Sequence, residues 1–206
     1  MPLSRPNRSR SRSGKSNGRR DVAPAAYRMP LTASHDALLE SGSDRKLRAL
    51  ISNLFTIAGR MTRVREHLGR RMGITGPQYS LVVAVAHLQG QSGISVGTIA
   101  QALQVSSAFV ASESGKLARR GLLLKRTNPD DRRSVLLSIG PAGRLRLERV
   151  SPEIRAINDL LFGFLNVKAF AAFASIAASL EESSGLAEQH VDAVASAPNS
   201  ASRAAG

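Results

Sequence analysis

The chain has 206 residues, no cysteine and a formal net charge of +14 at pH 7. The lack of cysteine excludes disulfides, thiolate metal sites and cysteine nucleophiles. The strong positive charge makes nucleic acid the expected partner, and an aromatic content of only 4% favours a core of aliphatic helices.

The two ends of the chain have the composition of disordered segments. Residues 1–40 combine Arg, Ser, Gly and Pro with few apolar side chains, so they cannot bury enough surface to offset chain entropy. Seven of the 29 lysines and arginines lie in the first 20 residues, and this arm either solubilises the protein or binds nucleic acid. Residues 189–206 are predicted to form a second disordered tail. No apolar run approaches the ~18 residues of a membrane span, so we expect no membrane partner and a cytoplasmic, nucleoid-associated location.

Two helices are predicted in the first half of the chain. Ser43 is a suitable cap for a long helix over residues 43–72, whose apolar side chains recur at helical spacing until Gly73. Thr75 and Gln78 then have the spacing of a capping box, which opens a helix that ends at Leu88. Residues 81–86 are all apolar, so this second helix is expected to be buried.

The middle of the chain has the pattern of a winged helix. Ser95 and Ser106 are caps of two short helices joined by a tight link, although a plain helical hairpin would have the same pattern. After Gly121, two apolar strands over 122–126 and 134–139 enclose a turn rich in Asn, Pro and Asp. Residues 94–139 are therefore predicted to form a DNA-reading lobe.

Long apolar helices follow the wing. One begins at Pro141, where Pro152 is expected to bend or interrupt it, and the last runs from about Val167 to Leu186. One small lobe cannot bury all these apolar faces, so a homodimer is predicted. The fold class is mainly α (α+β): a winged helix-turn-helix lobe with a two-stranded β wing, flanked by N- and C-terminal dimerisation helices at 43–72 and 141–188.

The segment 121–143, GLLLKRTNPDDRRSVLLSIGPAG, closely resembles the MarR family of bacterial regulators, as do residues 74–79 and 94–106 upstream. The resemblance implies a MarR-type domain over 41–188 and a homodimer on a pseudopalindromic DNA operator. It further implies sequence-specific transcription regulation by an autonomous repressor that a small aromatic or phenolic effector releases. The chain departs from the family at Glu113 and Ser114, where apolar residues are usual, and at Gly115, which weakens a helix by ~1 kcal/mol relative to Ala.

Candidate DNA-binding residues lie on the second short helix and on the wing. Side chains near the start of a recognition helix meet base edges, whereas later basic residues suit phosphates. Ser106 also fits a cap, and Phe109 belongs either to the core or against a thymine methyl. The resemblance implies that Arg132 enters the minor groove while Asp130 orients its guanidinium, although the turn could instead contain an ordinary Asp cap. The candidates are Ser106, Ser107, Phe109, Ser112, Lys116, Arg119, Asp130, Arg132 and Arg133.

An effector pocket is expected between the dimerisation helices and the lobe. Its candidate polar anchors, each of which also fits a surface or helix-packing role, are Arg60, His67, Arg71, Tyr79 and His87. The four histidines lack the spacing of a metal site, so no metal or other cofactor is predicted.

Other function classes have less support in the sequence. No Gly-rich phosphate loop, nucleophile elbow or HExxH helix is present, so the chain is not expected to be an enzyme. A nonspecific architectural DNA- or RNA-binding protein that uses its basic arm remains an alternative. The operator, the regulated genes, the identity of an effector and the choice between repression and activation stay open.

Overall fold

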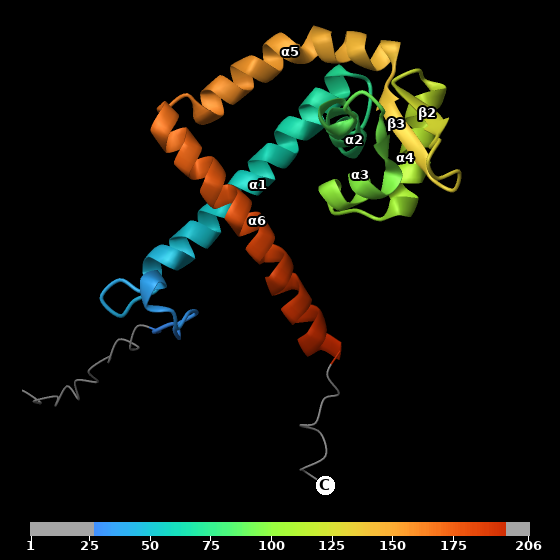
Figure 1. Cartoon of the computed structure of the whole chain (residues 1–206). Helices are drawn as coiled ribbons and strands as arrows, with labels where there is room; N and C mark the ends of the chain where they lie inside the picture. The colour runs from blue at the N-terminus through green and yellow to red at the C-terminus, as the bar shows by residue number, and fades with distance from the viewer. Residues whose placement is uncertain (1–26, 197–206) are drawn as a thin grey trace, which may run out of the picture. The chain divides into compact units, whose positions relative to one another are not determined.

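The computed structural model describes residues 27–196, which are mostly helical (Figure 1). The elements in chain order are a 3-10 turn at Asp36–Leu38, α1 at Arg45–Arg71, α2 at Gly76–Leu88, β1 at Ile94–Ser95, α3 at Val96–Leu103, α4 at Ser107–Arg119, β2 at Leu123–Thr127, β3 at Val135–Ile139, α5 at Pro141–Phe162 and α6 at Val167–Ser196. The chain divides into two compact units, the first ending at Leu54 and the second beginning at Phe55.

The first unit is ordered further upstream than predicted. The Thr32 backbone N–H and hydroxyl donate to Asp44 Oδ2 at 2.7 and 2.6 Å, and Arg48 pairs with the other carboxylate oxygen. The Thr32 hydrogen bonds lower the pKa of the buried Asp44 carboxyl. Residues 27–40 thus contain a 3-10 turn and contact the start of α1, which corrects the predicted disorder of 1–40 in this part. The rest of that arm lies outside the described residues.

Local signals set the junction of α1 and α2. Gly73 has a φ of +69°, which only glycine adopts without strain, and α1 ends before it. The predicted capping box of α2 is confirmed, because Thr75 Oγ1 accepts from Gln78 N–H at 3.3 Å and Gln78 Oε1 accepts from Thr75 N–H at 3.2 Å. Arg120 and Arg146 donate to the carbonyls of Gly73 and Met72 at 2.8 and 2.6 Å, which caps the end of α1.

The predicted two-stranded wing is part of a three-stranded antiparallel sheet. The strand order is β1-β3-β2, and Leu137 of β3 pairs with Ile94 on one side and Lys125 on the other. β2 and β3 confirm the predicted strands, and β1 was missed because two residues are too short to show an alternating pattern. Within this sheet, β3 contacts α2 and α3, and β2 contacts α4.

The core lies in the lobe, as predicted from the winged-helix pattern. Ile99, Val110, Leu117, Leu122 and Leu123 are fully buried. In α2, Leu81, Val82 and Val85 are fully buried while Val83 is exposed, so the helix has one outer stripe. These side chains form one core shared by α3, α4 and the strands, and the mainly helical winged-helix fold is confirmed.

Of the two effects predicted for Pro152, a bend or an interruption, the structure excludes the interruption, and the last helix is longer than predicted. α5 continues across Pro152 without an interruption. α6 extends to Ser196, so residues 189–196 are helical where a disordered tail was predicted. No Gly or Pro lies between Leu186 and Ser196, so the strongest helix breakers are absent from this stretch. Residues 197–206 lie outside the described part.

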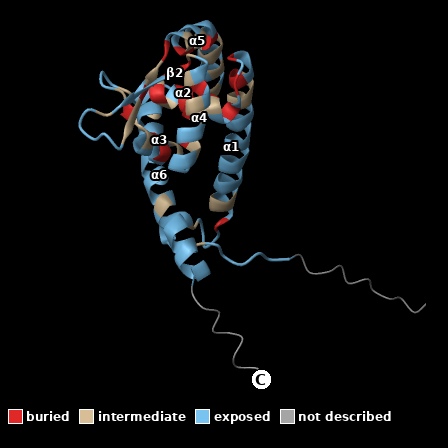
Figure 2. Ribbon diagram, turned by 90° about the vertical axis from the view of Figure 1, so that its right-hand side faces the viewer, coloured by how far each residue is buried: buried red, intermediate tan, exposed pale blue. Residues whose placement is uncertain are grey.

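The long helices expose much apolar surface. α6 has no buried residue and is almost wholly pale blue in Figure 2. Phe170, Phe173, Ile176 and Leu180 on α6 are all exposed. Within residues 27–196, no single helix has the length and composition of a membrane span; only α5 and α6 taken together, with a bend of 93° between them, meet both criteria.

Candidate nucleic-acid interface and ligand pocket

The second short helix, α4, presents a polar outer face. Its cap is Ser106, whose Oγ accepts from Phe109 N–H at 3.1 Å. Ser107, Ser112, Lys116 and Arg119 are exposed, and the last three follow the spacing of one helical face. This face carries most of the candidates that the sequence placed on α4.

Two of the α4 residues that the sequence analysis singled out, Phe109 and Ser114, face inward. Phe109 is half-buried and packs against the core, so the structure supports the core interpretation of this side chain. Ser114 is fully buried, and its hydroxyl donates to the Ala111 carbonyl at 3.1 Å. A buried hydroxyl paired within its own helix is satisfied, so Ser114 fits a core position.

Glu113, the other departure from the family pattern, has a specific set of partners. Gln78 Nε2 donates to Glu113 Oε2 at 2.8 Å, and Lys116 Nζ donates to Glu113 Oε1 at 2.6 Å. The Lys116 hydrogen bond, followed by the Gln78 bond, lowers the pKa of the Glu113 carboxyl. The carboxylate is 14% exposed and stays ionised, which ties the predicted DNA-binding Lys116 to an acid.

The wing tip is closed by Asp131 and leaves its neighbours exposed. The Asp131 carboxylate accepts from Arg133 N–H at 3.0 Å, and the Asp131 carbonyl accepts from Ser134 N–H at 2.9 Å. Asp130, Arg132 and Arg133 have exposed side chains. Among the described residues, no ion pair joins Asp130 to Arg132, so the free wing contains the Asp-capped turn without the implied orienting contact.

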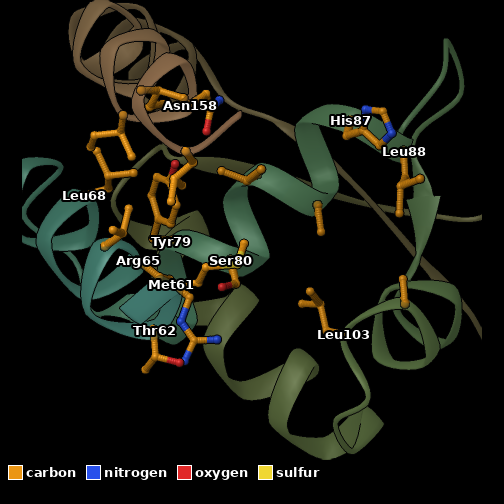
Figure 3. A pocket seen from close by; sticks show the side chains of 17 residues that line it. Met61, Thr62, Arg65, Leu68, Tyr79, Ser80, His87, Leu88, Leu103 and Asn158 are labelled. Atoms are coloured by element: carbon orange, nitrogen blue, oxygen red, sulfur yellow. The ribbon is translucent and has the colours of Figure 1, made fainter. Parts of the chain in front are cut away.

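A cavity of about 620 Å³ lies among α1, α2, α3 and α5 (Figure 3). This size falls within the range of ligand pockets for small molecules. The walls are mainly aliphatic, and the polar side chains among them include Tyr79 and His87, two of the predicted anchors. Burial raises the pKa of the Tyr79 hydroxyl, so it is neutral at physiological pH.

Arg65 is a charged cavity residue that the sequence analysis did not predict. It lies between Met61 and Leu68 on the face of α1 that lines the cavity. Its Nε is buried without a hydrogen-bond partner among the described residues. The available signal was an arginine within an otherwise apolar helical face, four residues after Met61. An unpaired buried donor is costly, and a ligand oxygen would satisfy it.

The other three predicted anchors do not line this cavity. His67 Nε2 lies 2.5 Å from Glu153 Oε1, and Arg71 Nε donates to Glu153 Oε2 at 3.1 Å. These contacts join the end of α1 to α5, and the bond from His67, followed by that from Arg71, lowers the pKa of Glu153. Arg60 is exposed on α1. Within residues 27–196, no group of three His, Asp or Glu side chains is arranged to hold a metal ion.

Comparison with known proteins agrees with this geometry. The MarR family model matches residues 74–135, from the residue before the α2 capping box to the first residue of β3. A sequence search of curated proteins gives no match. The structure is similar to the transcriptional regulator SlyA, with a TM-score of 0.58 and 15% identity over 69% of this chain and 98% of that one.

Two further solved structures have the same fold. A MarR family transcription regulator, SP03579, gives a TM-score of 0.56 at 19% identity, covering 78% of this chain and 99% of its own. The MepR–DNA complex of S. aureus gives 0.53 at 18% identity, covering 64% and 96%. The MarR family model thus matches residues 74–135, and the described residues have the fold that these solved regulators share.

Proposed function

We propose that the protein is a sequence-specific DNA-binding transcription regulator. The observation that carries this proposal is the coincidence of the family match at 74–135 with the lobe that exposes the polar face of α4 and the basic wing tip. MepR, whose structure contains DNA, has the same fold. A rigid short helix beside a charged wing suits the major groove and the adjacent minor groove of one duplex.

The exposed candidates divide by chemistry. Ser107 and Ser112 near the start of α4 are short polar groups that suit base edges, and Arg119 farther along suits a phosphate. In the wing, Arg132 and Arg133 carry charge at the tip of a turn that Asp131 holds in shape. The net charge of +14 adds long-range attraction for the polyanion.

We further infer that the protein acts as a homodimer on a pseudopalindromic operator. Exposed apolar side chains recur along α6, and others lie on α1 at Leu50, Ile51 and Leu54. Exposed apolar side chains that recur along a helix in this way favour an interface. A second copy of the chain offers the same helices, and twofold symmetry then gives two lobes for two half-sites.

The cavity supports regulation by a small effector. Aliphatic walls, a buried neutral Tyr79 and an unpaired Arg65 Nε suit an aromatic ring that carries an oxygen acceptor. The cavity is lined by α1 and α5 as well as by α2 and α3. A bound ligand would therefore favour one position of the DNA-reading lobe relative to the long helices. We propose repression that such a ligand relieves, without a catalytic role, in the cytoplasm and at the nucleoid.

The decisive experiment is a competition assay with the full chain. Duplexes that the protein selects from a random pool are labelled, and unlabelled random duplex is added in excess. A specific regulator keeps its selected duplex because specific binding is typically 10³–10⁷-fold tighter than nonspecific binding. If random duplex displaced the labelled duplex in proportion to its concentration, the protein would instead be a nonspecific architectural protein.

The pocket is tested with two ring compounds that differ in charge. Benzoate is expected to raise the melting temperature more than benzyl alcohol, because its carboxylate pairs with Arg65. Arg65→Gln should abolish the difference, whereas Arg144→Gln on the exposed part of α5 should keep it. If benzoate and benzyl alcohol raised the melting temperature of the wild-type chain equally, Arg65 would not be a binding site for an anionic ligand group.

A further inference from the structure

The helix expected to read DNA carries an acid that is already bound to one of its own lysines. The Lys116 ammonium lies 2.6 Å from Glu113, three residues earlier on α4. An acid on a DNA-facing helix repels phosphates unless its charge is compensated. Here the compensating charge comes from Lys116, which the sequence predicts to bind DNA. The pairing therefore affects how this lysine can contact phosphates.

We propose that Glu113 is a positioning residue that fixes the direction of Lys116 and withholds part of its charge from phosphates, so that α4 favours its own site over random DNA. This inference rests on the proposed function of the lobe. It extends that function by assigning a role to a residue where the chain departs from the family pattern.

The geometry fits a fixed support better than a chance surface pair. The Glu113 side chain is only 14% exposed, whereas that of Lys116 is 53% exposed. A second donor, Gln78 Nε2, holds the other carboxylate oxygen at 2.8 Å. Gln78 is itself fixed, because its Oε1 accepts from Thr75 N–H in the capping box of α2. Both oxygens of Glu113 are therefore held, one by a rigid neighbour.

The electrostatic consequence follows from counterion release. A lysine that contacts a phosphate displaces one condensed counterion, which steepens the dependence of log K on log salt by about 0.9. A lysine paired with a largely covered carboxylate offers less free charge to any phosphate that approaches. Random DNA is bound almost wholly through such contacts, so the pair weakens nonspecific binding more than specific binding.

The test uses Glu113→Gln in the full chain. The amide keeps the shape of the side chain but loses the charge that holds Lys116. We expect severalfold tighter binding of a labelled random-sequence duplex, and a salt slope steeper by up to about 0.9 in a potassium chloride titration. The ratio of affinities for a duplex selected by the wild-type protein and for random duplex should fall.

Two controls separate this role from simpler effects. Glu148→Gln, an exposed acid on α5, adds the same net charge and should leave the slope unchanged. In a Lys116→Gln background, Glu113→Gln should have no further effect on the slope, because its action passes through that lysine. Thermal unfolding verifies that each variant is folded, and a salt slope does not report stability.

The outcomes are distinguishable. An unchanged slope and specificity ratio for Glu113→Gln would overturn the inference while leaving the proposed function intact. The same steepening with Lys116 absent would also overturn it, since the effect would then come from general charge. If the wild-type chain selected no duplex from the pool, the proposed function would fall, and the inference with it.

Discussion

At the scale of single residues, close backbone approaches decide which positions tolerate change. Gly143 lies in the first turn of α5 and is buried. A Cβ there would lie 2.1 Å from the Leu122 carbonyl oxygen and 2.7 Å from Ile139 Cδ1. The carbonyl belongs to the backbone at the start of the wing and cannot move freely. The close contact between α5 and the wing therefore depends on glycine at this position.

Two glycine substitutions are expected to have opposite effects on stability. Gly143→Ala should destabilise the fold by about 3 kcal/mol or more, because overpacking against backbone forces a shift. Gly115→Ala, in α4, meets only Arg119 Nη1 at 3.9 Å and should stabilise by up to about 1 kcal/mol. Urea unfolding of both variants checks the pair, and similar changes in both would contradict the steric account.

Arg132 gives a prediction about DNA binding. It lies exposed at the wing tip, so Arg132→Ala should leave the fold intact while weakening binding to a selected duplex by about 1–3 kcal/mol. Fluorescence anisotropy at several salt concentrations measures the change. Arg144→Ala, also exposed but on α5, is the matched control, and equal losses in both variants would indicate a general charge effect.

At the scale of elements, polar contacts join the end of α1 to α5 and to the end of α4. Glu153 on α5 holds His67 and Arg71 of α1, and the carbonyls at the end of α1 accept from Arg120 and Arg146. The C-terminal end of α1 is thus held by charged groups as well as by apolar packing. Contacts of this kind respond to pH.

The pH dependence of stability should include a contribution from Glu153. Its pKa is lowered on folding, from an ordinary value of 4.5, chiefly by the His67 hydrogen bond and then by Arg71. A group with a depressed folded pKa stabilises the protein above its unfolded pKa, and this stability is lost as pH falls through the folded pKa. Glu153→Gln should therefore melt below the wild type at pH 6, with the difference shrinking below pH 4.5. A gap that persists at acid pH would point to lost packing instead.

Elements defined by local signals could be predicted from the sequence. The caps at Thr75, Ser95 and Ser106 depend on side chains within three residues, so their spacing was sufficient. By contrast, β1 depends on pairing with β3, more than 40 residues away along the chain. The role of Arg65 depends on a cavity among four helices, and the partners of Glu113 include Gln78 on another helix. Such long-range contacts leave no periodic trace in one sequence.

At the scale of the whole molecule, the exposed apolar face of α6 is the main unsatisfied feature. Phe170, Phe173, Ile176 and Leu180 recur at intervals of three and four, so they share one side of the helix. Aromatic side chains bury about 150–250 Å² each. A protein that leaves this surface in water is prone to aggregate, whereas pairing with a second copy covers it.

The predicted dimer can be tested by light scattering. The wild type should have twice the 21.9 kDa mass of one chain at micromolar concentration. Ile176→Glu places a charge on the apolar side of α6 and should raise the dimer dissociation constant at least tenfold, which corresponds to about 1.4 kcal/mol. Ala178→Glu adds the same charge about 200° around the helix and should have less effect. A monomeric wild type would contradict the prediction.

The side-chain amide of Gln78 joins the start of α2 to Glu113 on α4. The residues at positions 78 and 113 can therefore not vary independently. Its oxygen closes the start of α2, and its nitrogen holds the acid on α4. Glutamate closes a capping box as well as glutamine does, yet at position 78 it would set one carboxylate against another. In diverging descendants of this chain, Glu at 78 should thus appear only together with loss of the acid at 113, and the two sites should be inherited as a couple.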